Sequence, residues 1–189
     1  MIQKEAQQHV IRPVRADEWE KVKEIRLASL ADPVAHIAFL DTHEAASARP
    51  DAFWQERTEG AASGNVVRQF VAEDAAGVWG GSVSVLVERA GSDSVLEDPI
   101  EQDQAHLVGV YVRPEHRGTG LIEALFSAAV EWAWSLPEPE LERVRLFVHE
   151  ENARAAAFYR RFGFAATGKT VPVPGTTGAR EVEYALSRA

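Results

Sequence analysis

One segment of the chain combines glycines and basic residues in an arrangement that suits anion binding. It reads Arg-Pro-Glu-His-Arg-Gly-Thr-Gly over residues 113–120, between an apolar run and a long helical pattern. Glycines permit positive φ angles and close backbone approach, and the first turn of a helix has amide N–H groups without partners inside the helix. Such a turn attracts phosphate, and Arg113, His116 and Arg117 add positive charge. A flexible helix start with a solvated basic surface is the alternative interpretation.

Two better-known phosphate-binding motifs do not match this loop. A P-loop requires Lys followed by Ser or Thr after its last glycine, whereas Leu121 and Ile122 occupy those positions. A Rossmann fingerprint follows the first strand of the fold and requires a third glycine where this chain has Glu123. Nucleotide binding of either kind is therefore not expected.

A second segment, residues 148–164, places an amide and a hydroxyl on one face of an expected helix. Asn152 is a favoured N-cap for the helix that follows it. Tyr159 lies seven residues later, which is two helical turns along the same face. Its hydroxyl can donate a proton, although half-buried packing is the more common role of a tyrosine. Gly163 is expected to end the helix.

Hydrophobic periodicity and turn signals predict the elements that position both segments. Residues 31–47 lack a clean period, and connections of that length often act as lids or binding loops. The order β-α-α-β-β-β-α-β-α-β-β predicts an α/β fold with a mixed sheet, parallel crossovers through the two later helices and hairpins at both ends. Strands are expected over residues 10–14, 66–73, 78–88, 106–112, 144–148, 164–167 and 181–186, and helices over residues 19–30, after residue 50, and over 118–135 and 153–162.

Length and composition exclude several classes of protein. The 189 residues are 46% hydrophobic and 26% charged, which predicts a single domain over residues 1–189 with its core between about 10 and 188. The chain contains no Cys, so disulfide frameworks and thiol catalysis are excluded. A formal net charge of -9 disfavours a nucleic-acid partner. No secretory signal or membrane-spanning run is visible, so we expect a cytoplasmic protein without a membrane partner.

Together the two segments resemble the GNAT superfamily of acyl-CoA-dependent N-acetyltransferases. The text V-Y-V-R-P-E-H-R-G-T-G resembles the superfamily's pyrophosphate-binding motif, and N-x-x-A-x-x-F-Y-x-x-x-G-F, from Asn152 to Phe164, resembles its second signature. The motif Q/R-x-x-G-x-G/A can be aligned in two registers, with an acidic Glu115 as the mismatch in one and a bulky Ile122 in the other. The resemblance implies an α/β fold with a mixed, mostly antiparallel central sheet, a β-α-β-α-β core, helices on both faces and a V-shaped splay between two central strands.

The same resemblance implies acetyl-CoA as co-substrate, bound in this V. Main-chain groups of Val110 and Val112, on either side of Tyr111, would pair with the pantetheine amides, and Asn152 would contact the pantetheine arm. No metal is expected, because the histidines lack metal-ligand spacing. The loop amides that would hold the pyrophosphate belong to Arg117, Gly118, Thr119, Gly120, Leu121 and Ile122.

The implied activity is transfer of an acetyl group to a primary amine, on a small molecule or a protein, by direct attack, since no Cys exists to form an acyl-enzyme. His106 stands where the superfamily usually has a general-base Glu, and an imidazole with an ordinary pKa of about 6.5 is a competent base. A histidine that only bonds a backbone carbonyl is an equal alternative, and Glu101, Asp103 and His149 are further candidate bases. Tyr159 would face the thioester sulfur and protonate the leaving thiolate.

Three segments are expected to frame the amine acceptor, namely residues 31–47, 88–103 and 169–180. The second is acidic and would attract a cationic amine, although a solvated hairpin loop is the more common role of such a stretch. A non-catalytic acyl-CoA-binding module and a purely structural domain are the alternative functions. Exposed tryptophans and the edge of the last strand are compatible with a homodimer, for which no interface is assigned.

Overall fold

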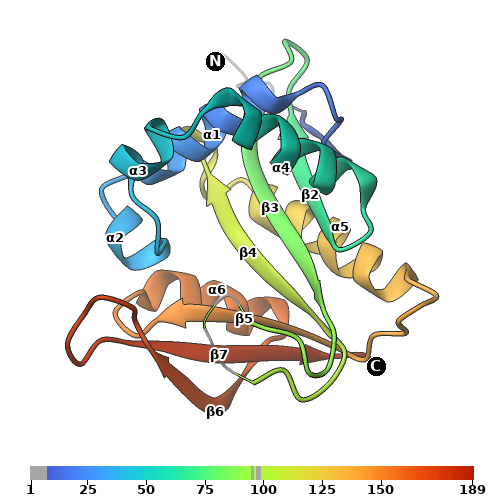
Figure 1. Cartoon of the computed structure of the whole chain (residues 1–189), viewed down its shortest axis with the longest axis vertical. Helices are drawn as coiled ribbons and strands as arrows, with labels where there is room; N and C mark the ends of the chain where they lie inside the picture. Colours follow the sequence, from blue (N-terminus) through green and yellow to red (C-terminus); the bar gives the residue numbers. More distant parts are fainter. Residues whose placement is uncertain (1–7, 95, 97–98) are drawn as a thin grey trace, which may run out of the picture.

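Seven strands form one open sheet in the computed structural model, which describes residues 8–94, 96 and 99–189 (Figure 1). Their order across the sheet is β1-β2-β3-β4-β5-β7-β6, and all neighbours are antiparallel except β4 and β5. The strands are β1 (Val10–Pro13), β2 (Val67–Glu73), β3 (Trp79–Glu88), β4 (Gln104–Val112), β5 (Arg143–His149), β6 (Ala165–Pro172) and β7 (Arg180–Ser187). The helices are α1 (Trp19–Leu30), α2 (Ala35–Ala38), α3 (His43–Ser47), α4 (Asp51–Ser63), α5 (Leu121–Ser135) and α6 (Ala153–Phe162), with a single 3-10 turn η1 (Pro114–His116) before α5.

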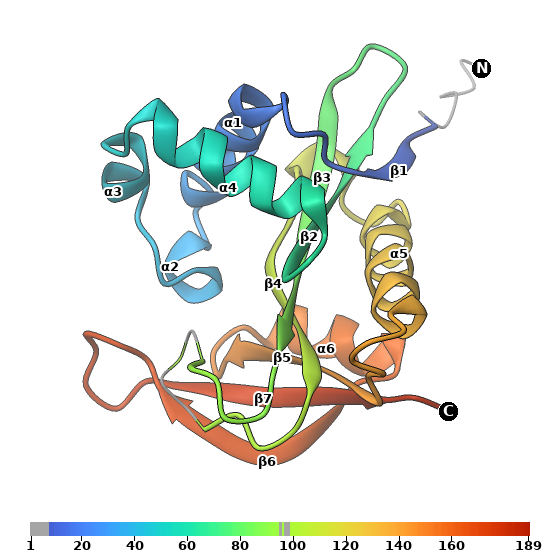
Figure 2. The same ribbon diagram turned by 45° about the vertical axis from the view of Figure 1, so that its right-hand side comes forward.

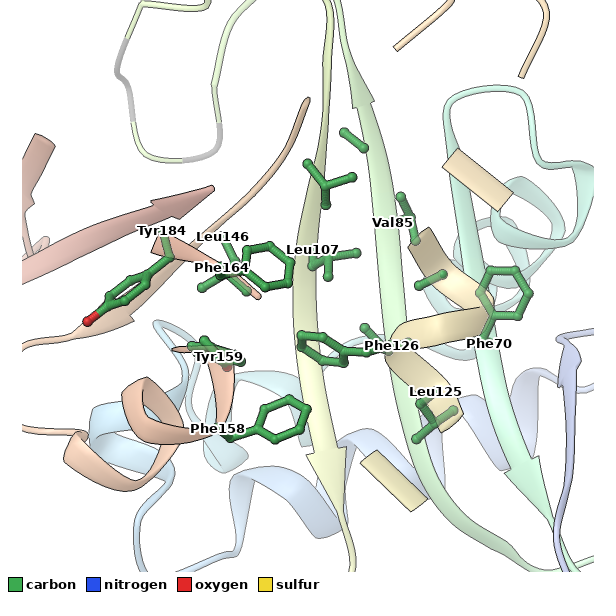
Figure 3. Packing of buried hydrophobic residues seen from close by; sticks show 14 of the residues in the cluster. Phe70, Val85, Leu107, Leu125, Phe126, Leu146, Phe158, Tyr159, Phe164 and Tyr184 are labelled. Atoms are coloured by element: carbon green, nitrogen blue, oxygen red, sulfur yellow. The ribbon is translucent and has the colours of Figure 1, made fainter. Parts of the chain in front are cut away.

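Helices cover both faces of the sheet, as Figure 2 shows with α1 to α4 on one side and α5 on the other. On the α5 side, Phe126 contacts Phe158 and Tyr159 of α6, so that aromatic rings fill the space between the two helices (Figure 3). On the opposite side, Trp54 of α4 and Trp79 of β3 belong to a second buried cluster beneath α1. The two clusters hold helices on opposite faces of the same strands.

The two central strands β4 and β5 separate soon after they begin. Their register contains only Ala105 opposite Val144 and His106 opposite Arg145. Beyond His106, β4 keeps its antiparallel partner β3, whereas its other edge has no strand neighbour. Figure 1 shows β4 and β5 running in clearly different directions beyond this point. The sheet therefore has a V-shaped opening at its centre.

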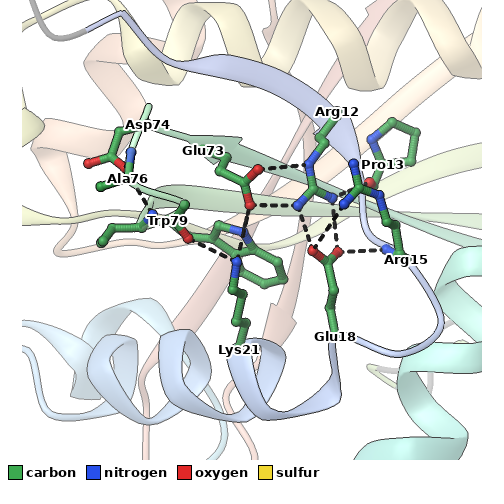
Figure 4. Close-up of polar contacts among 11 residues, drawn as sticks. Arg12, Pro13, Arg15, Glu18, Lys21, Glu73, Asp74, Ala76 and Trp79 are labelled. Carbon is green, nitrogen blue, oxygen red and sulfur yellow. Dashed lines mark hydrogen bonds and ion pairs between the residues drawn. The ribbon is translucent and has the colours of Figure 1, made fainter.

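A charged network fixes the beginning of α1 (Figure 4). The guanidinium of Arg12 bonds Glu18 and Glu73, at 2.6 Å in each case. Glu73 also accepts from Trp79 Nε1 at 2.9 Å and from Lys21 Nζ at 3.3 Å. Arg12 holds the pKa of Glu73 down to about 2, with further lowering by Trp79 and Lys21, so the carboxylate is ionised throughout the neutral range. The network therefore ties α1 to β1, β2 and β3.

This architecture confirms the predicted α/β fold class, its mostly antiparallel sheet and its central splay. The second predicted crossover runs from β5 through α6 to β6. These two strands are parallel but are not neighbours in the sheet, because β7 lies between them and is antiparallel to both. The region 31–47 is not a plain loop, since it holds the short helices α2 and α3. The edge strand β6 extends further than the predicted 164–167, because it pairs with β7 up to Pro172.

The structure corrects both observations that suggested a homodimer. No tryptophan among the described residues is fully exposed: Trp54 and Trp79 are buried, and Trp19, Trp132 and Trp134 are half-buried. The last strand in the chain, β7, is flanked on both sides, so the sheet edge belongs to β6. Within residues 8–94, 96 and 99–189, no helix combines the length and the apolar character that a bilayer crossing requires.

Candidate active site

A cavity of about 640 Å³ lies at the V between β4 and β5. Its wall is built from both faces of the sheet, with α1, α2 and α4 on one side and α5 and α6 on the other. Leu107 to Val112 of β4 and Leu146 to His149 of β5 form the two arms. Groups bound on opposite faces of the sheet can therefore meet through this opening.

The loop that joins β4 to α5 carries a row of free backbone donors at one end of the cavity. In the part of the chain that the structure describes, the amides of residues 118–123 donate no hydrogen bond, and the next amide, that of Ala124, donates to Gly120 O at 3.1 Å. Gly118 and Gly120 have φ angles of 74° and 86°, in the left-handed region that favours glycine. Free donors at the positive end of a helix dipole form an environment that stabilises anions.

The basic side chains of this loop are placed differently from the expected cationic cluster. Arg113 lies outside the cavity wall, because its guanidinium pairs with Glu24 of α1 at 2.6 Å. Arg117 lines the cavity but is held by Asp32 at 2.5 Å. His116 lines the cavity, and its ring contacts that of His9 edge-on. The prediction that Arg113 adds positive charge to the site is therefore wrong, and the charge of Arg117 is largely neutralised by Asp32.

The remaining loop residues contribute to the site in two ways. Gly118 and Ile122 lie in the cavity wall, so the bulky residue of the second motif register is tolerated there. Leu121, the first residue of α5, has its side chain buried in the core. The hydroxyl of Thr119 donates to His116 O at 2.5 Å. Thr119, Gly120 and Leu121 thus offer the site backbone amides and no side chain.

A bulge in β4 alters the strand where it faces the cavity. Ser82 and Ser84 of β3 pair with Tyr111 and Val108, which leaves Gly109 and Val110 together opposite a single β3 residue. Gly109 has a φ of 62°. Val110, Tyr111 and Val112 all line the cavity, next to the strand edge that β5 leaves unpaired. An extended ligand could add to this edge as a further strand would.

His106 lies at the vertex of the V and lines the cavity although only 2% of it is exposed. Its Nδ1 is in a very short contact with Glu88 of β3. Burial alone would raise the pKa of Glu88, but His106 and Arg145 beside it outweigh that cost and leave the pKa below its usual value. An ionised carboxylate only accepts hydrogen bonds, so Nδ1 carries a proton, and in the neutral form of the imidazole Nε2 is the nitrogen with the free lone pair. The structure thus replaces the backbone-carbonyl alternative by a carboxylate–imidazole pair.

Buried charges extend this pair across the vertex. Arg145 of β5 donates to Glu88 at 2.6 Å and to Glu183 of β7 at 3.1 Å. Gln104 donates to the same Glu88 oxygen at 3.1 Å. The carboxylate that orients His106 is therefore itself held by groups from two other strands.

Tyr159 is buried under the other arm of the V and reaches the cavity from α6. Its ring stacks on Phe126, with centroids 5.7 Å apart and planes at 17°. Burial, together with the negative charge of Glu181, raises the pKa of the Tyr159 hydroxyl well above its usual value. The hydroxyl therefore keeps its proton at physiological pH and can donate a hydrogen bond into the cavity, although it is a weaker acid than an exposed tyrosine.

Glu181 is a site residue that sequence reasoning missed. It lies at the start of β7, directly opposite His149 in the β5–β7 register, and both residues line the cavity. Burial raises the pKa of Glu181 to about 7. No local motif marks Glu181, since only the pairing of β5 with β7 brings it beside Tyr159.

Other candidate bases are placed unequally by the structure. Glu101 and Asp103 lie outside the cavity wall, and Asp103 is occupied by Arg89 at 3.2 Å. They do not reach the site that was expected for them. His149 does reach it, with Nδ1 accepting from the amide of Glu151 at 3.1 Å.

Asn152 and its neighbour Arg154 line the cavity at the start of α6. The Asn152 side chain also caps that helix, accepting from the amide of Ala155 at 3.3 Å. The helix-cap reading is therefore confirmed, and the side chain is at the same time accessible from the cavity. Arg154 was missed because an arginine in the first turn of an exposed helix carries no distinctive sequence signal.

The three segments expected around the acceptor contribute unequally. Residues 31–47 supply much of one wall, mainly through α2 and its flanks. Among the described residues of 88–103, only Leu96 lines the cavity, and the carboxylate of Glu88 is consumed by ion pairs. None of residues 169–180 lines the cavity. No described acidic residue of 88–103 therefore lines the cavity to attract a cationic amine, and Glu97 and Asp98 lie outside the described residues.

Fold and site together define an acetyltransferase of the GNAT type. The acetyltransferase (GNAT) family model matches residues 19–164, and the chain belongs to this family. Across 69 residues it is 35% identical to a protein of Bacillus subtilis (strain 168) that is named as a candidate ribosomal protein bS18-alanine N-acetyltransferase. That match covers 36% of this chain and 44% of the relative, so it spans less than half of the relative's length.

Solved structures share the fold at low sequence identity. The acetyltransferase of the GNAT family from Streptococcus pneumoniae has a TM-score of 0.72 at 16% identity, covering 96% of this chain and all of that one (100%). A spermidine N-acetyltransferase chimera from Vibrio cholerae SpeG and hSSAT has a TM-score of 0.66 at 18% identity, with 95% of each chain covered. These similarities confirm the arrangement of the sheet and helices.

Proposed function

We propose that this protein is an N-acetyltransferase that transfers the acetyl group of acetyl-CoA to a primary amine by direct attack. The observation that carries the proposal is the cavity at the V, where a row of free amides, an unpaired β4 edge, an oriented imidazole and a protonated tyrosine meet. The membership of the chain in the GNAT family supports the same reaction class.

The residues present match the chemistry of acetyl-CoA as a substrate. Free amides of residues 118–123 would bind its pyrophosphate, and backbone groups of Val110 and Val112 would pair with the amides of its extended arm. Asn152 lines the path between them. The substrate supplies an activated thioester, and no metal ligand set is present among the described residues.

The ammonium form of the acceptor must lose two protons in the reaction, one before attack and one as the amide forms, and the leaving thiolate must gain one. His106 Nε2 would accept a proton of the ammonium form of the acceptor, either directly or through a water, and Glu88 would stabilise the resulting imidazolium. The free amine would attack the thioester carbon, the C–S bond would break, and Tyr159 would protonate the leaving thiolate. The attacking nitrogen would release its second proton to water as the amide forms, and Tyr159 would regain a proton from water. Amides of the β4 bulge would stabilise the negative charge that develops on the carbonyl oxygen.

Thiol release measured with acetyl-CoA and a panel of amines tests this proposal. We expect turnover with wild type, and a loss of about 10²–10⁴-fold in kcat for His106→Ala. Calorimetric binding of acetyl-CoA to both proteins is the companion measurement, since His106→Ala should bind the co-substrate normally. Tight binding without turnover on any amine would favour the non-catalytic acyl-CoA-binding module, and absence of binding would contradict both functions.

A further inference from the structure

Two arginines on the α1 and α4 side of the cavity are not used by the proposed reaction. Arg26 of α1 and Arg57 of α4 line the main cavity, and both also line a recess of about 30 Å³ beneath these helices. Gly109 and Tyr111 of β4 line both spaces as well, so the recess adjoins the main cavity at the β4 bulge.

The arginines bring more positive charge to this wall than the nearby carboxylates neutralise. Asp41 is bound by Arg49 through contacts of 2.6 and 3.1 Å and lies 3.8 Å from Arg26. Within the described residues, the guanidinium of Arg57 makes no hydrogen bond or ion pair. Three arginines thus share one aspartate. Asp32, the other carboxylate that lines the cavity on this side, is occupied by Arg117.

The environment makes this excess charge costly in the free protein. Burial lowers the pKa of Arg26 to about 10, with a further contribution from the positive charge of Arg57. Arg57 is exposed at the cavity, and partial desolvation together with the charge of Arg49 lowers its pKa as well. A bound anion would relieve both effects, because it supplies the missing opposite charge.

The recess is polar and has room for one small group. Its remaining wall includes Ser29, Gln69, Ser82 and Ser84, and the Gln69 side-chain amide donates to the Ser82 hydroxyl at 2.8 Å. The recess is on the same face of the sheet as His106. Ser84 of the recess and Leu86 are two residues apart on β3, so their side chains lie on the same face of the sheet. Leu86 is paired with His106, which therefore lies on that face as well.

An apolar surface lies beside the two arginines. Arg26 is placed over the ring of Phe39, 4.8 Å from its centroid. Val34, Ile37 and Leu40 also line the cavity around α2, and Val34 and Leu40 are exposed. A ligand bound here therefore meets a cationic recess and an apolar wall on the face that carries the proposed base.

We propose that the acceptor amine also carries a carboxylate, held by Arg26 and Arg57, and an apolar side group that packs against α2. An apolar α-amino acid has this chemistry. The inference rests on the proposed function, and it reverses the expectation of a purely cationic acceptor. Arg26 and Arg57 would determine specificity, while His106 and Tyr159 would carry the proton transfers.

The experiment compares matched acceptors by thiol release at saturating acetyl-CoA. The pairs are L-leucine with L-leucinamide, L-phenylalanine with L-phenylalaninamide, and O-phosphoethanolamine with ethanolamine, which separates a carboxylate from a phosphate. Two charge-assisted contacts lead us to expect a kcat/KM about 10- to 100-fold higher for each amino acid than for its amide. The amide has the more readily neutral amine, so its chemical reactivity works against this preference.

Substitutions then connect the preference to the two side chains. In Arg57→Gln and Arg26→Gln the amino acid should lose its advantage mainly through KM, while KM for acetyl-CoA stays unchanged. Arg57→Lys keeps the charge and should retain part of the preference. Arg15 lies between β1 and α1 with its side chain 67% exposed, so Arg15→Gln is the control and should behave as wild type.

An equilibrium measurement separates this inference from the proposed function. Calorimetry of the CoA-loaded protein with N-acetyl-L-leucine and N-acetyl-L-leucinamide should show binding of the acid alone, lost in Arg57→Gln. If the acid binds but no amine is turned over, carboxylate binding at the recess is supported and the proposed N-acetyltransferase activity is contradicted. If amides or ethanolamine are turned over as efficiently as the amino acids, the proposed carboxylate site is contradicted, while the proposed N-acetyltransferase activity is retained. Preference for O-phosphoethanolamine over the amino acids would overturn the carboxylate assignment.

Discussion

The hydroxyl of Tyr159 offers a substitution that changes chemistry with little change in packing. Tyr159→Phe removes one oxygen and keeps the ring that stacks on Phe126. We expect kcat to fall about 10²-fold, because the leaving thiolate loses its proton donor. KM for acetyl-CoA and the melting temperature should change little, since the hydroxyl makes no hydrogen bond within the described residues. Steady-state kinetics and thermal unfolding provide the measurements.

Tyr184→Phe is the matched control for this prediction. Tyr184 is buried in the same aromatic cluster, with its ring 6.4 Å from that of Tyr159, and it lies outside the cavity wall. It should retain wild-type turnover. Equal rates in wild type and Tyr159→Phe would remove the tyrosine from the mechanism.

Glu181 makes stability depend on pH. Burial raises its pKa in the folded protein to about 7 from an ordinary value of 4.5. The folded state therefore binds more protons than the unfolded state between these values, and stability from this group is lost as the pH rises through the window. Glu181→Gln removes the buried charge, so its melting temperature relative to wild type should increase between pH 5 and pH 8.

The exposed Glu151 provides the comparison, because Glu151→Gln should show a difference from wild type that does not vary with pH. A constant offset for Glu181→Gln across the same range would show that burial does not perturb its titration.

Among elements, the start of α5 and the strand β4 are the two whose backbone is proposed to bind substrate directly. Gly120 has a φ of 86° as the N-cap of α5, and a Cβ there would meet no atom within 4 Å. Gly120→Ala should therefore act through backbone strain, with a loss of about 1–2 kcal/mol. If the helix start relaxes to avoid this strain, the free amides move and KM for acetyl-CoA should rise.

Gly60→Ala in α4 is the matched substitution. Its Cβ would also meet no atom within 4 Å, but Gly60 has an ordinary helical conformation. Alanine there should stabilise the protein by about 0.5–1 kcal/mol and leave the kinetics unchanged. Denaturant unfolding and acetyl-CoA titrations of both variants test the comparison. A Gly120→Ala protein with both wild-type stability and a wild-type KM would contradict this prediction, because the strain must either be retained or be relieved by moving the amides.

Features of the site that are formed by residues close in sequence could be predicted, whereas features that depend on contacts between distant segments could not. The order of the elements and the loop before α5 are local features, so glycine spacing and hydrophobic periodicity reveal them. Glu181 and Arg57 reach the cavity only through the packing of β7 and α4, and neither has a marker in its own segment. The isolated sequence also suggests free charge at Arg113, whereas Glu24, 89 positions away, neutralises it.

At the scale of the whole molecule, the V requires a strong connection where its arms meet. β4 and β5 share only two register pairs, so the backbone ladder there is short. Side chains take over this role: Arg145, 1% exposed, joins Glu88 of β3 to Glu183 of β7, and Glu88 contacts His106 of β4. Four strands thus meet in one buried charge network beside the proposed base.

Arg145→Met tests whether this network holds the two arms together. The substitution leaves the carboxylates of Glu88 and Glu183 buried without the guanidinium between them, so we expect a loss of about 3–5 kcal/mol. Arg143→Met removes another partner of Glu183, bonded at 2.5 Å but half-buried, and should cost about 1 kcal/mol or less because Arg145 remains. Urea unfolding followed by tryptophan fluorescence compares them. Equal losses would mean that apolar packing, and not the buried ion network, joins the arms of the V.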